Sequence, residues 1–345
     1  MCSINISITK CSEGDILAED IYSKNGMNLI VAKGIEFNRY TLGRLADMGI
    51  NEVRIYRSKE DESHSGWPEF RSTYKRIAML TKSIFQDMIS GKTIDRLRIS
   101  IISEQLYQSI YEDDRIADCI HELRQKDEYT YHHSINVAFY AMLLAKWLKL
   151  TKDEIIKAIQ AGLLHDIGKI MVSGSILNKA EALTNEEFEA VKKHTLYGFE
   201  IVKSLDYLDR DIKKAILLHH ERLDGSGYPF RYNFNDINLY ARIVAIADVF
   251  DAMTSERIYK KRSTPFEVFK MFLTEGVGMF DLGIVDLFMK KMSNCLIGSK
   301  VLLSDGTAGD IVYIPYHNIT DPVVRVGDEY VDLARENNLT IESML

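Results

Sequence analysis

The stretch Ala161-Gly162-Leu163-Leu164-His165-Asp166 ends an apolar helical run with two side chains of the kinds that bind metal ions. A second run, Ala215-Ile216-Leu217-Leu218-His219-His220, ends in the same way. Adjacent residues of a helix point about 100° apart, so two neighbours can contact different ions or different sides of one ion. We therefore predict that a helical core presents these side chains to a shared metal site.

Three further side chains extend this predicted site. Asp248 follows the apolar stretch 243–247, where a carboxylate is costly to bury unless a cation pairs with it. With it, the predicted ligands are His133, His165, Asp166, His194, His219, His220 and Asp248. One ion with an open position needs fewer than seven ligands. We therefore predict two divalent transition-metal ions, Fe or Mn, with Asp166 spanning both.

Each of these residues also has an ordinary structural interpretation. A single histidine on a helix is more often a hydrogen-bonded core or surface group than a ligand. Asp248 alone fits a helix cap or an ion pair with Arg242. His132 is adjacent to His133, and we predict that His132 is the one that faces outward. The combination of two His-containing helix ends with a buried Asp248 favours metal binding.

The whole chain has the composition of a globular protein, with 345 residues and a hydrophobic fraction of 46%. Its net charge of −7 argues against general binding to DNA or to an anionic membrane. The four cysteines form no C-x-x-C pair, which favours a reducing compartment. No apolar run approaches the ~20 residues needed to cross a bilayer. We therefore predict a soluble, cytoplasmic protein.

Periodicity predicts a mainly α fold, with a helical region between a small α/β N-terminal domain and a small β-rich C-terminal domain, and the family resemblance given below implies that this region holds an all-helical catalytic domain. The predicted parts are 1–58 (α/β), 59–68 (linker), 69–115 (connecting helices), 116–292 (catalytic) and 296–345 (β-rich). Helices are predicted at 37–48, 71–90, 94–124, 131–148, 152–164, 185–205, 209–218 and 239–253. Strands are predicted at 28–34, 52–56, 300–303, 309–314, 323–326 and 330–333. The Pro and Gly cluster at 224–229 predicts a loop.

The chain from about 116 to 289 resembles the HD-GYP family of HD-superfamily metal-dependent phosphohydrolases. The most specific match is His219-His220-Glu221-Arg222-Leu223-Asp224-Gly225-Ser226-Gly227-Tyr228-Pro229. Segments 129–137, 164–169 and 248–255, together with Phe280-Asp281, complete the pattern. The resemblance implies an all-α domain with two or three metals that hydrolyses the bacterial second messenger cyclic di-GMP. Members with a third metal have Glu where this chain has Tyr129, so we favour two.

The resemblance also implies residues that face the substrate. Asp166 and Lys169 are the predicted catalytic residues, and Lys169, Arg257 and Lys260 match positions that face the substrate phosphates. A solvent-facing Lys169 and an ordinary solvated basic face at 257–260 are the alternatives. Tyr228 is predicted to contact the substrate. Its loop alternatively docks a partner or braces the end of the helix before it.

These features predict an enzyme, a phosphodiesterase that converts cyclic di-GMP to linear pGpG or to GMP. One alternative is a hydrolase of cyclic GMP-AMP, because the core motifs would look the same. Another is an adaptor that binds a cyclic dinucleotide or a protein without turnover. Signalling proteins that contact the Gly227-Tyr228-Pro229 loop, and a second copy of the chain in a homodimer, are the predicted macromolecular partners.

Overall fold

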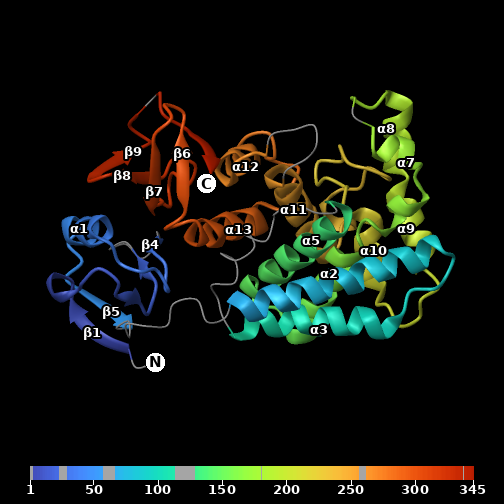
Figure 1. Ribbon diagram of the computed structural model, residues 1–345, viewed down its shortest axis with the longest axis horizontal. Helices are drawn as coiled ribbons and strands as arrows, with labels where there is room; N and C mark the ends of the chain where they lie inside the picture. Colours follow the sequence, from blue (N-terminus) through green and yellow to red (C-terminus); the bar gives the residue numbers. More distant parts are fainter. Residues whose placement is uncertain are drawn as a thin grey trace. The chain divides into compact units, whose positions relative to one another are not determined.

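The computed structural model describes residues 3–22, 29–56, 67–112, 129–179, 181–255, 262–336 and 338–345 (Figure 1). The chain divides into two units. The mixed unit comprises Met1–Ser65 and Met289–Leu345, and the helical unit comprises Gly66–Phe288. Helices make up most of the described secondary structure, which confirms the prediction of a mainly α protein.

The described residues of the helical unit form mainly helices. Its longer helices are α2 (Trp67–Ile89), α3 (Arg96–Glu112), α5 (Tyr129–Trp147), α6 (Lys152–Leu164), α8 (Asn185–Lys192), α9 (His194–Val202), α10 (Arg210–Leu218), α11 (Leu239–Thr254) and α12 (Pro265–Leu273). Short turns of helix are η2 (Ile167–Met171), α7 (Gly174–Leu177) and η3 (Phe234–Asp236). Helix α13 (Leu282–Cys295) begins in this unit and ends in the mixed unit.

The core of the helical unit forms around α5 and α11. Residues 133–145 of α5 and most of α11 are buried, and a helix that is apolar on every side is typical of a protein interior. Helix α5 packs against α6 and α11, while α2 and α3 pack against each other (Figure 1). The polar residues of α5 and α11 are therefore enclosed by neighbouring helices.

Helix α6 has the predicted bounds, 152–164, because its ends carry clear signals. Thr151 caps its N-terminus in a capping box with Glu154. The prediction of one helix over 185–205 is wrong, because α8 and α9 are separate helices that meet at Lys193. The break redirects the chain so that α9 packs against η2.

The contact between η2 and α9 requires a residue without a side chain at position 168. A Cβ atom added to Gly168 would lie 2.0 Å from the backbone oxygen of His194 and 2.3 Å from the backbone nitrogen of Gly198. The two backbones therefore touch directly. This contact fixes the segment that carries Asp166 beside the first turn of α9.

The mixed unit contains three antiparallel sheets. Its strands are β1 (Ser3–Ser7), β2 (Ile16–Leu17), β3 (Ile21–Tyr22), β4 (Leu29–Val31), β5 (Glu52–Tyr56), β6 (Lys300–Leu303), β7 (Ala308–Tyr313), β8 (Val323–Val326), β9 (Glu329–Asp332) and β10 (Ile341–Met344). The strand orders are β1-β5-β2, β3-β4 and β10-β6-β7-β8-β9. The remaining elements are η1 (Ile8–Lys10) and α1 (Arg39–Asp47).

The first and last segments of the chain are joined within the mixed unit. The side-chain nitrogen of Asn38 donates to the backbone oxygen of Val312 at 2.8 Å, and the Tyr40 ring packs against Tyr313 and Tyr330. The sequence analysis predicts two separate small domains at 1–58 and 296–345. These domain boundaries stay predictions. Among the described helices, none is both long and apolar enough to span a bilayer.

Candidate metal centre

Seven polar side chains from separate segments meet inside the helical unit. They are His133 on α5, His165 and Asp166 after α6, His194 at the start of α9, His219 and His220 after α10, and Asp248 on α11. The structure thus brings together all seven residues that the sequence predicts as ligands.

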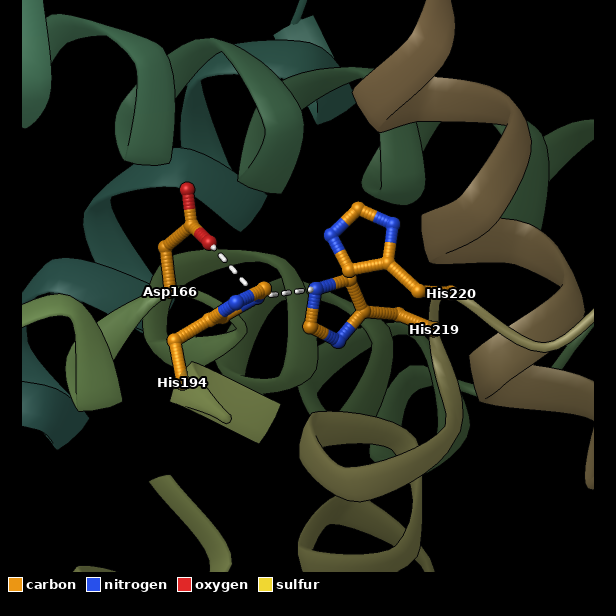
Figure 2. Close-up of side chains that lie close together, drawn as sticks. All are labelled: Asp166, His194, His219 and His220. Carbon is orange, nitrogen blue, oxygen red and sulfur yellow. Dashed lines mark hydrogen bonds and ion pairs between the residues drawn. The ribbon is translucent and has the colours of Figure 1, made fainter. Parts of the chain in front are cut away.

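The seven side chains fall into two groups whose ligand atoms lie within 4.8 Å of one another. The first group is Asp166, His194, His219 and His220, and the second is His133, His165 and Asp248. Figure 2 shows the first group, in which the His194 ring lies between the Asp166 carboxylate and the His219 ring. Groups of three and four ligands suit two ions, each with room for water or substrate.

Three of the imidazole rings are oriented by the backbone. The Nδ1 atoms of His165, His194 and His219 each lie 2.7–2.9 Å from the carbonyl oxygen three residues earlier. A carbonyl oxygen only accepts, so each Nδ1 carries the ring proton of the neutral imidazole. Each Nε2 therefore presents a lone pair to the centre. Hydrogen bonds of this kind commonly orient the histidine ligands of metals.

His133 is oriented by a carboxylate instead of a carbonyl. Its Nδ1 donates to Oδ2 of Asp251 at 2.8 Å, and its Nε2 lies 3.1 Å from Oδ1 of Asp248. Burial disfavours the charged ring, but the hydrogen bonds with Asp248 and Asp251 outweigh it and raise the pKa of His133 to about 9. Binding of a metal at Nε2 therefore requires loss of the proton at that atom.

Asp166 faces both groups with different oxygen atoms. Its Oδ1 lies 3.3 Å from Nε2 of His194, in the first group. Its Oδ2 lies 3.2 Å from Nε2 of His165 and 3.6 Å from Nε2 of His133, in the second group. Burial opposes ionisation, yet the neighbouring His165 and Lys169 lower the pKa of Asp166 well below its usual range. An ionised Asp166 has the geometry of a bridging carboxylate.

The polar atoms of the centre fit a cation better than they fit one another. The Nε2 atoms of His194 and His219 lie 3.4 Å apart, although both carry lone pairs. Nε2 of His165 and Oδ1 of Asp166 are buried without a hydrogen-bond partner. Burial lowers the pKa of His194 and His219, which keeps both rings in the neutral form that binds metals. Two positive ions, one in each group, would satisfy these acceptors.

An aromatic ring and two lysines lie beside the ligand groups. The Tyr228 ring stacks on His220, with ring centroids 4.7 Å apart. Lys192 holds its ammonium group 5.6 Å from the centre of the Tyr228 ring. The ammonium group of Lys169 lies 2.5 Å from Oδ2 of Asp166, and its side chain is 30% exposed. Lys169 is therefore a partner of the centre, and its interpretation as a purely solvent-facing lysine is wrong.

The loop that carries Tyr228 is anchored to the residues that precede it. A Cβ atom added to Gly227 would lie 2.4 Å from the backbone nitrogen of Arg222, so the loop backbone packs directly on this segment. The buried Glu221 carboxylate accepts hydrogen bonds from the backbone nitrogens of Phe230 and Tyr232 at 2.6 and 3.0 Å. The loop thus braces the end of α10, which is one of the roles that the sequence left open.

Other sequence predictions have different outcomes. Asp248 does not pair with Arg242, because the Arg242 guanidinium donates to Oδ2 of Asp281 at 2.7 Å. His132 lies outside both ligand groups and stacks on the ring of Tyr74. Arg257 and Lys260 lie outside the described residues, so their predicted contact with substrate phosphates stays a prediction.

Sequence reasoning did not identify Lys192 or Asp251 as parts of the site. Lys192 stands in the Lys192-Lys193-His194 segment, and a basic pair before a ligand was its only signal. Asp251 stands one helical turn after Asp248, which places both carboxylates on one face of α11. That spacing was the available signal for a carboxylate that orients a ligand.

The chain is similar in sequence to a protein family and to several known phosphodiesterases. Residues 116–281 match the HD domain family. A cyclic di-GMP phosphodiesterase of Pseudomonas aeruginosa is 34% identical over 244 residues, which cover 71% of this chain and 59% of that relative. A 3'3'-cGAMP-specific phosphodiesterase of Vibrio cholerae is 39% identical over 153 residues, which cover 43% of this chain and 33% of that relative. The chain thus spans between about a third and about three fifths of the length of these relatives.

A solved structure has a similar fold. An HDG"Y"P protein from Bdellovibrio bacteriovorus aligns with a TM-score of 0.55 over 83% of this chain and 98% of its own, at 17% identity. At this identity the alignment supports the fold alone. It extends beyond residues 116–281, because it covers most of the chain.

Proposed function

We propose that residues 116–281, which match the HD domain family, form a metal-dependent phosphodiesterase that hydrolyses cyclic di-GMP to linear pGpG or to GMP. The observation that carries this proposal is the pair of ligand groups that meet at the two oxygens of Asp166. The similarity to a cyclic di-GMP phosphodiesterase and the paired histidines before the 224–229 loop, typical of HD-GYP proteins, support this substrate.

Two divalent transition-metal ions, Fe or Mn, are the proposed cofactors, because imidazole and carboxylate donors suit such ions. The proposed ligands are the seven residues of the two groups. When bound, such a pair of ions supplies Lewis-acid charge that lowers the pKa of water and neutralises phosphate oxygens. Tyr129, in place of the Glu found in members with a third metal, supports a count of two.

The side chains around the ligands have proposed roles of their own. Asp166 holds both ligand groups in register, and Lys169 is placed to donate a proton or a hydrogen bond to the leaving oxygen of the phosphate. Lys192 and Tyr228 lie beside the ligand groups, where a cation and an aromatic ring suit a phosphate and a purine base. Arg257 and Lys260 are proposed to bind the second phosphate, from the resemblance alone.

Two other substrates or roles compete with this proposal. Similarity to a cGAMP-specific phosphodiesterase supports hydrolysis of cyclic GMP-AMP as the second candidate. An adaptor that binds a cyclic dinucleotide without turnover is the third. The outward side of the loop region suits a protein partner, because Phe230 and Tyr232 stack on each other and remain 46% and 39% exposed. A second copy of the chain is also a proposed partner.

The decisive experiment separates these candidates in one assay. The full chain, loaded anaerobically with Fe(II) or Mn(II), would be incubated with cyclic di-GMP or with 3'3'-cGAMP, and the products separated by chromatography. We expect metal-dependent conversion of cyclic di-GMP at a higher kcat/KM than that of 3'3'-cGAMP. Faster conversion of 3'3'-cGAMP would select the second candidate. Binding of either nucleotide without any product from the metal-loaded protein would select the adaptor.

A further inference from the structure

A chain of buried polar side chains leads from α2 to one of the candidate ligands. The Tyr74 hydroxyl on α2 lies 3.0 Å from Oδ1 of Asn136 on α5. Nδ2 of Asn136 lies 3.0 Å from Oδ1 of Asp251 on α11. Oδ2 of Asp251 lies 2.8 Å from Nδ1 of His133. All four residues are buried, with exposed fractions of 5% or less.

The direction of each hydrogen bond follows from the groups that take part. The Asp251 carboxylate can only accept, so the Asn136 amide must point its nitrogen at Asp251 and its oxygen at Tyr74. The Tyr74 hydroxyl therefore donates to Asn136. On the other side, Asp251 receives the proton on Nδ1 of His133, which leaves Nε2 as the ligand atom. The Asn136 amide thus has one orientation, while the Tyr74 hydroxyl also lies 3.1 Å from Nδ1 of His132.

This series of hydrogen bonds ends at His133, a member of the second ligand group. His133 belongs with His165 and Asp248, whereas His194 and His219 are oriented by the carbonyl oxygens of their own segments. Tyr74 also lies outside residues 116–281, which match the HD domain family. It stacks on His132, the residue before His133, so the ring and the hydroxyl both contact the segment that carries the ligand.

We propose that Tyr74 is a positioning residue for His133, through which α2 sets the metal affinity of the His133-His165-Asp248 group. This inference rests on the proposed function, because it requires the two groups to bind metal. Removal of the Tyr74 hydroxyl leaves the Asn136 oxygen without its donor, which frees the amide to turn. Asp251 then holds the His133 ring less firmly, and Nε2 spends less time in the orientation that binds the ion.

The test measures binding of Mn²⁺ alone, by calorimetric titration and by the electron paramagnetic resonance of free Mn²⁺. Loss of a partner that directly orients a ligand costs about 10–100-fold in metal affinity. Tyr74 acts through two further hydrogen bonds, so Tyr74→Phe should weaken one Mn²⁺ ion by about 3–10-fold and leave the other unchanged. Asn136→Ala should weaken the same ion by about tenfold or more. Tyr74→Phe in the Asn136→Ala background should then add little.

A matched control removes a tyrosine hydroxyl that has no path to the centre. The Tyr207 hydroxyl donates to the backbone oxygen of Ile94 at 2.8 Å, in the same helical unit. Tyr207→Phe should therefore lower stability by a similar amount and leave both Mn²⁺ affinities unchanged. His133→Ala provides a second control, because Tyr74→Phe should have no further effect on Mn²⁺ once the ligand is gone.

The possible results separate this inference from the function on which it rests. Two Mn²⁺ ions bound equally well by wild type and Tyr74→Phe would overturn the role of Tyr74 and leave the proposed function intact. Equal weakening of both ions, or weakening that persists with His133→Ala, would overturn it as well. No Mn²⁺ binding by the wild-type chain would overturn both proposals.

Discussion

Asp166 is the residue at which the two ligand groups meet, because its two oxygens face different groups. Asp166→Ala should therefore weaken both ions and reduce hydrolysis of cyclic di-GMP by more than ~100-fold, since even partners of ligands are worth about 10–100-fold. Circular dichroism should still report a helical fold, because apolar helices supply the core. Asp206→Ala, at an exposed position, is the control and should keep full activity. Near-normal turnover by Asp166→Ala would reject the bridging role.

Lys192 lies beside Tyr228 and pairs with Glu189, and it is proposed to bind the substrate. Lys192→Met should raise KM for cyclic di-GMP by about 3–10-fold with little change in kcat, because a partly exposed charge contributes less than the ~1.5–3 kcal/mol of a buried charged hydrogen bond. Lys203→Met removes an exposed lysine that pairs with Glu200, and should change neither constant. Steady-state kinetics at two salt concentrations would measure both. A KM that stays at the wild-type value would exclude Lys192 from substrate binding.

At this scale the sequence predicted the seven residues that the structure brings together, and it missed the residues that orient them. His219, His220 and the loop after them could be recognised because ligands and loop are neighbours in the chain. Tyr74 and Asn136 could not, because their hydrogen bonds join residues that are 62 and 115 positions apart in the sequence. Only the packing of α2, α5 and α11 reveals which polar residues meet.

Among the described elements, η2 and α9 approach so closely at Gly168 that no side chain fits between them. Gly168→Ala would place a Cβ atom 2.0 Å from the backbone oxygen of His194, so the two elements must separate. We expect the free energy of unfolding to fall by about 1–3 kcal/mol, as for overpacked cores. Mn²⁺ affinity should fall as well, because Asp166 and His194 lie on opposite sides of this contact.

A matched glycine isolates the effect of that contact. A Cβ atom added to Gly174 would lie 3.7 Å from its nearest neighbour, which is an ordinary contact. Gly174→Ala should therefore change neither stability nor Mn²⁺ affinity, as measured by urea unfolding and by titration. If Gly168→Ala behaves like Gly174→Ala, the close approach of the two backbones does not hold the centre together.

The sequence predicted long elements better than breaks and short strands. The bounds of α6 and β5 agree with their predictions, because a capping box starts α6 and an alternating pattern marks β5. The break at Lys193 was missed, since apolar residues continue through it at helical spacing. Strands β2 and β3 have two residues each, too few for any periodicity to be seen.

For the whole molecule, metal binding should stabilise one unit and leave the other unchanged. All seven candidate ligands lie in the helical unit. A ligand at 100 times its Kd adds about 2.7 kcal/mol to the free energy of unfolding. Calorimetry with Mn²⁺ and with a chelator should therefore reveal one transition that shifts and one that does not. A chelator that shifts both transitions equally, or neither, would contradict this expectation.

The metal-free helical unit should be most stable near neutral pH. Burial lowers the pKa of His194, His219 and His220, so below about pH 6.5 the unfolded chain binds protons that the folded chain does not. Stability from these rings falls on acidification. The pKa of His133 is raised to about 9. Its contribution to the free energy of unfolding is therefore fully present below about pH 6.5 and is lost as the pH rises through 9. Urea unfolding with a chelator at pH 5.5, 7 and 9.5 measures both effects, and greater stability at pH 5.5 than at pH 7 would contradict them.

The grouping of the two chain ends was beyond sequence reasoning. Strand patterns at 300–303 and 323–326 correctly predicted β6 and β8, but nothing in them indicated contact with residues near the start of the chain. The hydrogen bond from Asn38 to Val312 spans 274 residues. A contact at that separation depends on the three-dimensional path of everything between.

The opposed ring nitrogens of His194 and His219 have a consequence for motion. Two lone pairs 3.4 Å apart repel each other. We therefore expect the segments that carry His194 and His219 to open locally more often than the rest of the helical unit when no metal is bound. Amide hydrogen exchange should consequently be faster at the start of α9 and at residues 219–220 than in α5 or α11 when a chelator is present. Added Mn²⁺ should slow exchange at those positions most. The ion would then suppress local opening of these segments in addition to its role in the reaction.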